Sequence, residues 1–176
     1  AAEVGAFTGL VKPDAKTVDY IVRTRGMDRK KAEGLLEGLA SDADAVYEKV
    51  IKIDASKLKP MVALPGDPGN GINVDDLPEG VKIDIAYGGS CTAGKFDDFA
   101  YYAQVCREAV EAGKTVADGV DFYIQFGSEA TQEAAREHGW IDTFERAGVR
   151  LINPGCGACI GCGPGVQTLD LAEISE

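Results

Sequence analysis

The chain has 176 residues, of which 45% are hydrophobic and 27% are charged, a composition typical of a soluble globular protein of one domain or slightly more. Its formal net charge of −11 argues against nucleic acid as a partner, because phosphate backbones bind basic surfaces. No apolar run approaches the roughly 18 residues needed to cross a bilayer, so we expect no membrane span.

The first part of the chain is predicted to be helical and then irregular. Helices are expected over residues 13–26, where Pro13 suits a helix start, and over residues 28–42, where leucines recur at helical spacing. The β-branched residues at positions 50–53 indicate a strand, and residues 61–66 indicate another. Prolines and glycines make the stretch that follows irregular.

Strands and helices alternate regularly after position 80. The predicted strands span residues 81–89, 120–127 and 149–155, and the predicted helices span residues 95–113 and 128–148. Ser128 is a candidate N-cap, and Gly139 a candidate interruption of the second helix. One face of the first helix is predicted to be apolar and carries Phe99, Tyr102, Val105, Cys106 and Val110, and we expect Cys106 in the core. This alternation predicts a three-layer α/β fold with a mainly parallel sheet.

Two cysteine segments follow strands of this predicted sheet. Cys91 comes after the first of the three strands, and Cys156 comes after the third. The carboxyl ends of parallel strands meet at one edge, where open α/β sheets bind their ligands. Cysteines that are far apart in the sequence are therefore expected to meet in space.

The second segment has the spacing C-x-x-C-x-x-C, formed by Cys156, Cys159 and Cys162. Gly157 and Gly161 lie between them and allow the backbone to turn tightly. Iron–sulfur clusters are held by cysteine thiolates that accept hydrogen bonds from such a backbone. A four-cysteine zinc site, a redox pair and small buried cysteines are the alternatives.

The number of ligands decides what a cluster can do. Four cysteine ligands, Cys91 with the three of the second segment, favour electron transfer or redox sensing. Three ligands leave one iron open to act as a Lewis acid on a substrate oxygen. Spacing alone leaves both readings open.

Five cysteines, with three crowded together, indicate a reducing, cytoplasmic compartment rather than a disulfide framework.

The two cysteine segments resemble known signatures. The sequences GGSCTAG (residues 88–94) and PGCGACIG (residues 154–161) resemble the cluster-binding motifs of the aconitase and isopropylmalate dehydratase superfamily. The A-E-x-G-A element at residues 2–6 and the helical stretch at residues 127–148 are similar to that family too. The resemblance covers nearly the whole chain and implies an aconitase-type α/β domain.

The resemblance implies an iron–sulfur-dependent hydro-lyase. Cys91, Cys156 and Cys159 match the ligands of a 4Fe-4S cluster whose fourth iron binds the hydroxyl and carboxylate of the substrate. Glu3 matches a catalytic glutamate near that iron. The implied reaction is the reversible dehydration of a hydroxy di- or tricarboxylate such as citrate or isocitrate, an aconitate hydratase-like step of the tricarboxylic acid cycle.

The sequence departs from the family pattern at three positions. Ala93 stands where the first signature has asparagine, and Phe126 stands where the family has the proline of P-G-S. Cys162 has no counterpart in the second signature, and we interpret it as a cysteine that does not bind the cluster.

The resemblance also implies that the chain is a fragment of a larger multidomain enzyme. We assign residues 1–48 to a helical lead-in from the preceding domain and residues 49–176 to the iron–sulfur-binding domain. The family's substrate-binding S-x-N-R-N-F element and the serine base of its swivelling domain are not in the sequence. We therefore expect the other domains or a subunit as partners, and no turnover by this chain alone.

Overall fold

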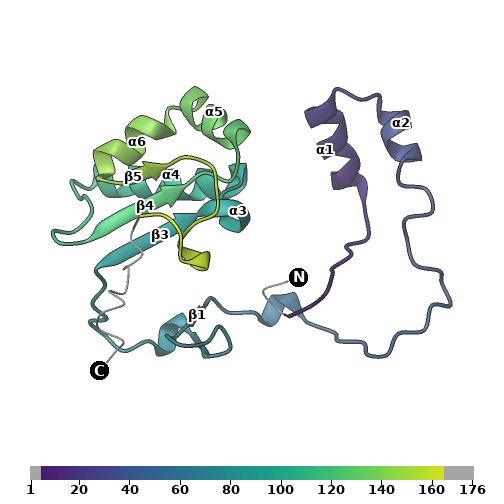
Figure 1. The fold of residues 1–176 in the computed structure, drawn as a ribbon, viewed down its shortest axis with the longest axis horizontal. Coiled ribbons are helices and arrows are strands. Elements are labelled where there is room, and N and C mark those ends of the chain that lie inside the picture. The colour runs from purple at the N-terminus through teal and green to yellow at the C-terminus, as the bar shows by residue number, and fades with distance from the viewer. Residues whose placement is uncertain (1–4, 165–176) are drawn as a thin grey trace. The chain divides into compact units, whose positions relative to one another are not determined.

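The computed structural model describes residues 5–164, and the chain divides into two units at residues 59 and 60 (Figure 1). The first unit holds two helices, α1 (Ala15–Arg25) and α2 (Arg29–Gly34). The second unit holds the strands and the remaining α-helices. The predicted domain boundary after residue 48 stays a prediction.

Helix α1 begins at a capping box rather than at the predicted proline. The carboxylate of Asp14 accepts hydrogen bonds from the backbone N–H groups of Lys16 and Thr17, at 2.9 and 3.2 Å. The Thr17 hydroxyl accepts from the Asp14 N–H in return, so Asp14 is the N-cap. Pro13 therefore lies just outside the helix. Helix α2 ends at Gly34, well short of the predicted residue 42.

The strand predicted around residues 50–53 is wrong. Val50, Ile51 and Ile53 have no regular structure and are about 70% exposed. A strand needs a partner to satisfy its backbone groups, and the described part of the first unit contains no other strand. In that part of the unit, Val18 and Ala32 alone are buried. Residues 5–59 thus form no hydrophobic core of their own.

The second unit opens with a short hairpin. Strand β1 (Met61–Ala63) pairs antiparallel with β2 (Gly71–Asn73), which confirms the first half of the predicted strand at residues 61–66. Asp67 organises the turn between them by accepting a hydrogen bond from the Gly69 N–H at 2.6 Å.

The main sheet has three parallel strands in the order β3-β4-β5, with bounds Ile85–Gly89, Asp121–Gln125 and Arg150–Ile152. Four helices follow or connect these strands: α3 (Ser90–Ala93), α4 (Phe96–Glu111), α5 (Glu129–Glu137) and α6 (Trp140–Ala147). Gly139, at a φ of 68°, separates α5 from α6 as predicted. The α/β fold with a parallel sheet is confirmed.

One face of the sheet packs against helices α4 and α6. Phe99 of α4 stacks on Phe126 at a ring separation of 4.5 Å and meets Phe144 of α6 edge-on at 5.9 Å. Cys106 belongs to this core, as predicted, whereas Val105 is 66% exposed and does not lie on the buried face of α4 to which its spacing assigned it. Since alternate strand residues point to opposite faces, Gln125 and Tyr123 of β4 lie on the face away from these helices.

Candidate functional site

The first cysteine segment is a tight turn that leaves the carboxyl end of β3. Gly89 has a φ of 96°, and a Cβ there would lie 2.0 Å from the backbone oxygen of Gln125. Ser90 follows with a φ of 67°, a left-handed conformation that is unusual for a residue with a side chain. Its buried hydroxyl accepts a hydrogen bond from the Cys91 N–H at 2.6 Å. The turn places Cys91 at the surface at the end of β3.

Neighbouring elements hold this turn in place. The Gly127 N–H donates to the Gly94 oxygen at 2.9 Å, and a Cβ on either glycine would collide with the backbone. From α4, the Tyr102 hydroxyl donates to the Ala93 oxygen at 3.1 Å. Burial raises the pKa of Tyr102, and the charge of Asp98 raises it further. The turn is therefore packed between β3, α4 and the end of β4.

The second cysteine segment is anchored by Gln125 at the end of β4. Its Nε2 donates to the backbone oxygens of Asn153 and Cys156, at 3.1 and 3.2 Å. The Tyr87 hydroxyl of β3 donates to the Gln125 Oε1. Gly157 is buried beside them, and a Cβ on it would lie 2.4 Å from the Gln125 Oε1 and 2.5 Å from the Tyr87 hydroxyl.

The two segments border one cavity of about 370 Å³. Six of its lining residues come from β3, the first cysteine turn and α4: Tyr87, Gly88, Gly89, Ser90, Ala93 and Tyr102. Ala158 and Cys159 come from the second segment. Figure 1 shows α3 and the yellow loop side by side at the ends of β3 and β4. Burial raises the pKa of Tyr87 and the nearby Cys159 raises it further, while a hydrogen bond from the Ala158 backbone acts in the opposite direction.

The predicted ligands Cys91, Cys156 and Cys159 are all exposed near this edge of the sheet. Their chemistry suits an iron–sulfur cluster, because such clusters are held by cysteine thiolates and tuned by hydrogen bonds to the sulfurs. Within residues 5–164, however, no group of three or more His, Cys, Asp or Glu side chains is arranged to hold a metal ion. Their role as ligands stays a prediction. Glu3 lies outside the described residues.

Comparison with known proteins decides the family. The aconitase family (aconitate hydratase) matches residues 1–79 and 76–173. The chain belongs to the aconitase family.

Curated relatives in the aconitase family are longer than this chain. The 3-isopropylmalate dehydratase large subunit of Clostridioides difficile is 38% identical over 175 residues, which are 99% of this chain and 39% of that protein. That of Wolinella succinogenes is 36% identical over 162 residues, or 92% of this chain and 36% of that protein. A probable methanogen homoaconitase large subunit from Methanothermobacter thermautotrophicus is 36% identical over 166 residues, or 94% and 36%. The chain thus spans less than two-fifths of each of these relatives.

The structure accounts for one departure from the aconitase-family signatures and describes the other two. The Phe126 N–H donates to the Ile152 oxygen at 3.1 Å, a bond that a proline would lack, and its ring fills the core. Ala93 stands where the signature has asparagine, and its backbone oxygen accepts a hydrogen bond from the Tyr102 hydroxyl. Cys162 is exposed, and its N–H donates to the Gly157 oxygen at 3.3 Å.

Sequence reasoning missed Gln125 and Tyr87. A signal was present, since a polar glutamine interrupts the apolar run of β4 two positions after Tyr123. The parallel register pairs Tyr87 with Tyr123 and Gly89 with Gln125, so the four residues share a face. The shared face of Tyr87 and Gln125 can be recognised only when the pairing of β3 with β4 is known.

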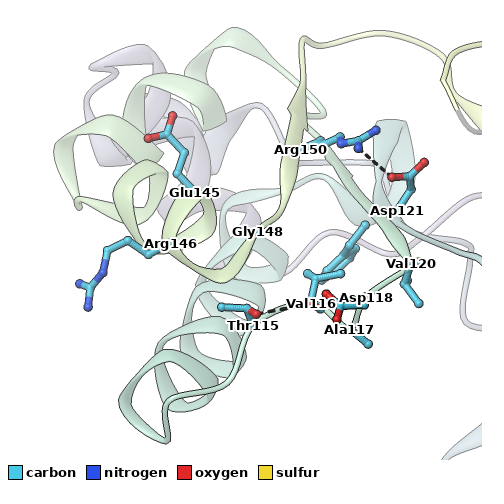
Figure 2. Close-up of a pocket in the computed structure, with 12 residues that line it drawn as sticks. Thr115, Val116, Ala117, Asp118, Val120, Asp121, Glu145, Arg146, Gly148 and Arg150 are labelled. Carbon is cyan, nitrogen blue, oxygen red and sulfur yellow. Dashed lines mark hydrogen bonds and ion pairs between the residues drawn. The ribbon is translucent and has the colours of Figure 1, made fainter.

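A second cavity, of about 640 Å³, lies at the opposite, amino-terminal ends of β4 and β5. Figure 2 shows Arg150 directed at Asp121, with which it forms an ion pair of 2.8 Å, while Arg146 points away from both. The charge of Arg150 is thus already paired.

In the part of the chain that the structure describes, no helix is long and apolar enough to cross a membrane.

Proposed function

We propose that this chain is the cluster-binding part of an iron–sulfur hydro-lyase that reversibly dehydrates a hydroxy di- or tricarboxylate. The observation that carries the proposal is the shared cavity. Two segments with aconitase-family signatures, far apart in the sequence, border the same space at the carboxyl ends of the strands. This is where α/β sheets bind ligands.

In this proposal Cys91, Cys156 and Cys159 hold a 4Fe-4S cluster. When bound, such a cluster with one iron free of protein ligands supplies a Lewis acid for the substrate hydroxyl. The chain itself supplies the thiolates, fixes the backbone of both cysteine segments and lines the cavity. Glu3 is the proposed catalytic residue that would help to position the departing water or hydroxyl.

The names of the relatives favour one branch of the substrate class. Two of the quoted relatives are 3-isopropylmalate dehydratase large subunits and the third is a probable homoaconitase large subunit. We therefore place a branched hydroxy dicarboxylate ahead of citrate and isocitrate, and a biosynthetic role ahead of the tricarboxylic acid cycle. The cysteine content still favours a cytoplasmic location.

The first unit supports the proposal of a partner. Phe7, Leu10, Val11 and Val46 are each more than 90% exposed. Leaving so much apolar surface in water is unfavourable, since burial is worth about 25 cal/mol per Å². We propose that this unit docks against the remaining domains of the enzyme, including the swivelling domain, or against its small subunit. The chain alone is then inactive.

A cysteine-to-serine series tests the proposed ligands. The chain is reconstituted anaerobically, and iron and acid-labile sulfide are measured per chain. Serine at Cys91, Cys156 or Cys159 should abolish cluster loading, while Cys162→Ser should retain it. An equal loss in Cys162→Ser would favour the four-cysteine electron-transfer or redox-sensing alternative.

Adding the substrate class separates these functions further. A 3-isopropylmalate-type hydroxy acid should change the electron paramagnetic resonance spectrum of the reduced, loaded chain, because an iron without a protein ligand can bind its hydroxyl. Succinate, which has no hydroxyl, is the control. Identical spectra with both acids, at concentrations at which the hydroxy acid binds the loaded chain, would contradict the hydro-lyase proposal.

A further inference from the structure

Gln125 is a buried polar side chain next to the predicted ligands. Its exposed fraction is 3%, and it lies on the sheet face away from the helical core. A buried amide is costly unless its hydrogen bonds are made. Gln125 belongs to neither family signature. It lies in β4, between the two cysteine segments in the sequence.

All polar atoms of this amide are used. The Nε2 group donates to the Asn153 and Cys156 oxygens, and the Oε1 accepts from the Tyr87 hydroxyl. The Asn153 and Cys156 oxygens are three residues apart, so one amide spans the first bend of the second cysteine segment, the loop that carries Cys156, Cys159 and Cys162. Gly157 is the next residue, and it lies against the side chains of Gln125 and Tyr87.

The other hydrogen bonds of the loop are mostly internal. The N–H groups of Ile160 and Cys162 donate to the Gly157 oxygen, at 3.2 and 3.3 Å, and that of Gly161 donates to the Ala158 oxygen at 3.0 Å. These bonds shape the loop but do not attach it to the sheet. Gln125 attaches the first part of the loop, at Asn153 and Cys156, from the centre of the sheet, and the Tyr87 hydroxyl of β3 meets the Ala158 backbone further along.

We propose that Gln125 is a positioning residue. It holds the backbone of residues 153–157 against the sheet and so keeps Cys156 and Cys159 at the edge that carries Cys91. It touches neither substrate nor thiol in this role. The value of such positioning for a cluster rests on the proposed function, whereas the attachment of the loop does not.

The test compares two glutamine-to-methionine variants of the whole chain. Gln125→Met keeps the approximate volume and removes both donors and the acceptor. Gln132→Met is the matched control, because Gln132 is only half-buried and donates to the Asn153 side chain, at 3.1 Å, rather than to the backbone of the loop. Amide hydrogen exchange is followed by nuclear magnetic resonance in metal-free samples, at Ile160, Gly161 and Cys162.

Gln125→Met should speed exchange at these loop amides by about tenfold, because two hydrogen bonds are lost together. The Val116 amide, which donates to the Ala147 oxygen at the other edge, should not change. Gln132→Met should leave all of them within about twofold. Unchanged loop exchange in Gln125→Met, or wild-type exchange as fast as in an unfolded peptide, would overturn the proposal.

Tyr87→Phe keeps the test valid if Gln125→Met fails to fold. It removes the hydroxyl that orients the amide and should speed loop exchange by about threefold. No acceleration in a folded Tyr87→Phe chain would then refute the arrangement.

Cluster loading gives the second readout. Iron and sulfide per chain should fall at least twofold in Gln125→Met and stay at the wild-type value in Gln132→Met. Normal loading in Gln125→Met would overturn the positioning role. If the wild type takes no cluster, the proposed function fails, while hydrogen exchange still decides the attachment of the loop.

Discussion

Replacing Gly157 with alanine probes the packing of the second cysteine segment. The backbone of Gly157 has φ −131° and ψ −154°, which any residue can adopt, so the effect is steric. A Cβ would lie 2.4 Å from the Gln125 Oε1, 2.5 Å from the Tyr87 hydroxyl and 3.1 Å from the Tyr87 Cζ. Real contacts of this kind are about 3.4 Å or longer, so the loop or both side chains must move.

The expected cost follows from these contacts. Overpacking costs about 1–3 kcal/mol, and each hydrogen bond broken by the movement adds about 1 kcal/mol. Detachment of the loop from the sheet limits the total, because the helical core can remain folded without it. We therefore expect Gly157→Ala to lower the free energy of unfolding by about 1–3 kcal/mol.

Urea denaturation, followed by circular dichroism, measures this change. Gly155→Ala is the matched control, because a Cβ there would meet the Gln125 Nε2 at 3.4 Å, and Gly155 does not have a positive φ. It should stay within about 0.5 kcal/mol of the wild type. A Gly157→Ala chain with wild-type stability and wild-type cluster loading would refute the close packing of Gly157 against Gln125 and Tyr87.

Three further predictions concern two core residues, Phe99 and Cys106, and the tyrosine Tyr102. Phe99→Ala should lower the free energy of unfolding by about 3–5 kcal/mol, because Phe99 is fully buried between Phe126 and Phe144; a loss below 1 kcal/mol in urea would contradict this. Cys106 should react with iodoacetamide much more slowly than the exposed Cys159, because burial shields its thiol and raises its pKa; mass spectrometry of the labelled chain checks the order. Burial raises the pKa of Tyr102 above that of an unfolded tyrosine, so its contribution to stability is complete below about pH 10 and is lost as the pH rises through the folded pKa. Between pH 9 and pH 11, the free energy of unfolding measured by urea denaturation should therefore fall less in Tyr102→Phe than in the wild type. An equal fall in both chains would contradict a raised pKa of Tyr102 in the folded state.

The sequence predicted those elements whose signals are local. Ser128 caps α5 by accepting a hydrogen bond from the Thr131 N–H at 3.2 Å, as expected from its position before an amphipathic segment. Gly139 interrupts the helix because glycine adopts a positive φ at little cost. The alternation of strands and helices also predicted which sheet edge carries both cysteine segments.

Features that depend on a distant partner were beyond local patterns. Residues 50–53 have strand-forming side chains, but strand formation depends on pairing that the described part of the unit does not offer. Val105 follows the apolar spacing of α4, yet α6 covers a face centred on Phe99 and Cys106 instead. Gln125 could be recognised as an anchor only after β3 and β4 were paired.

The metal and sulfide content of the chain tests the central claim most directly. Iron, zinc and acid-labile sulfide are measured per chain after anaerobic reconstitution, with Cys91→Ser prepared in parallel. The account predicts about four iron and four sulfide per wild-type chain and little of either in Cys91→Ser. Zinc without sulfide, or full loading without Cys91, would contradict it.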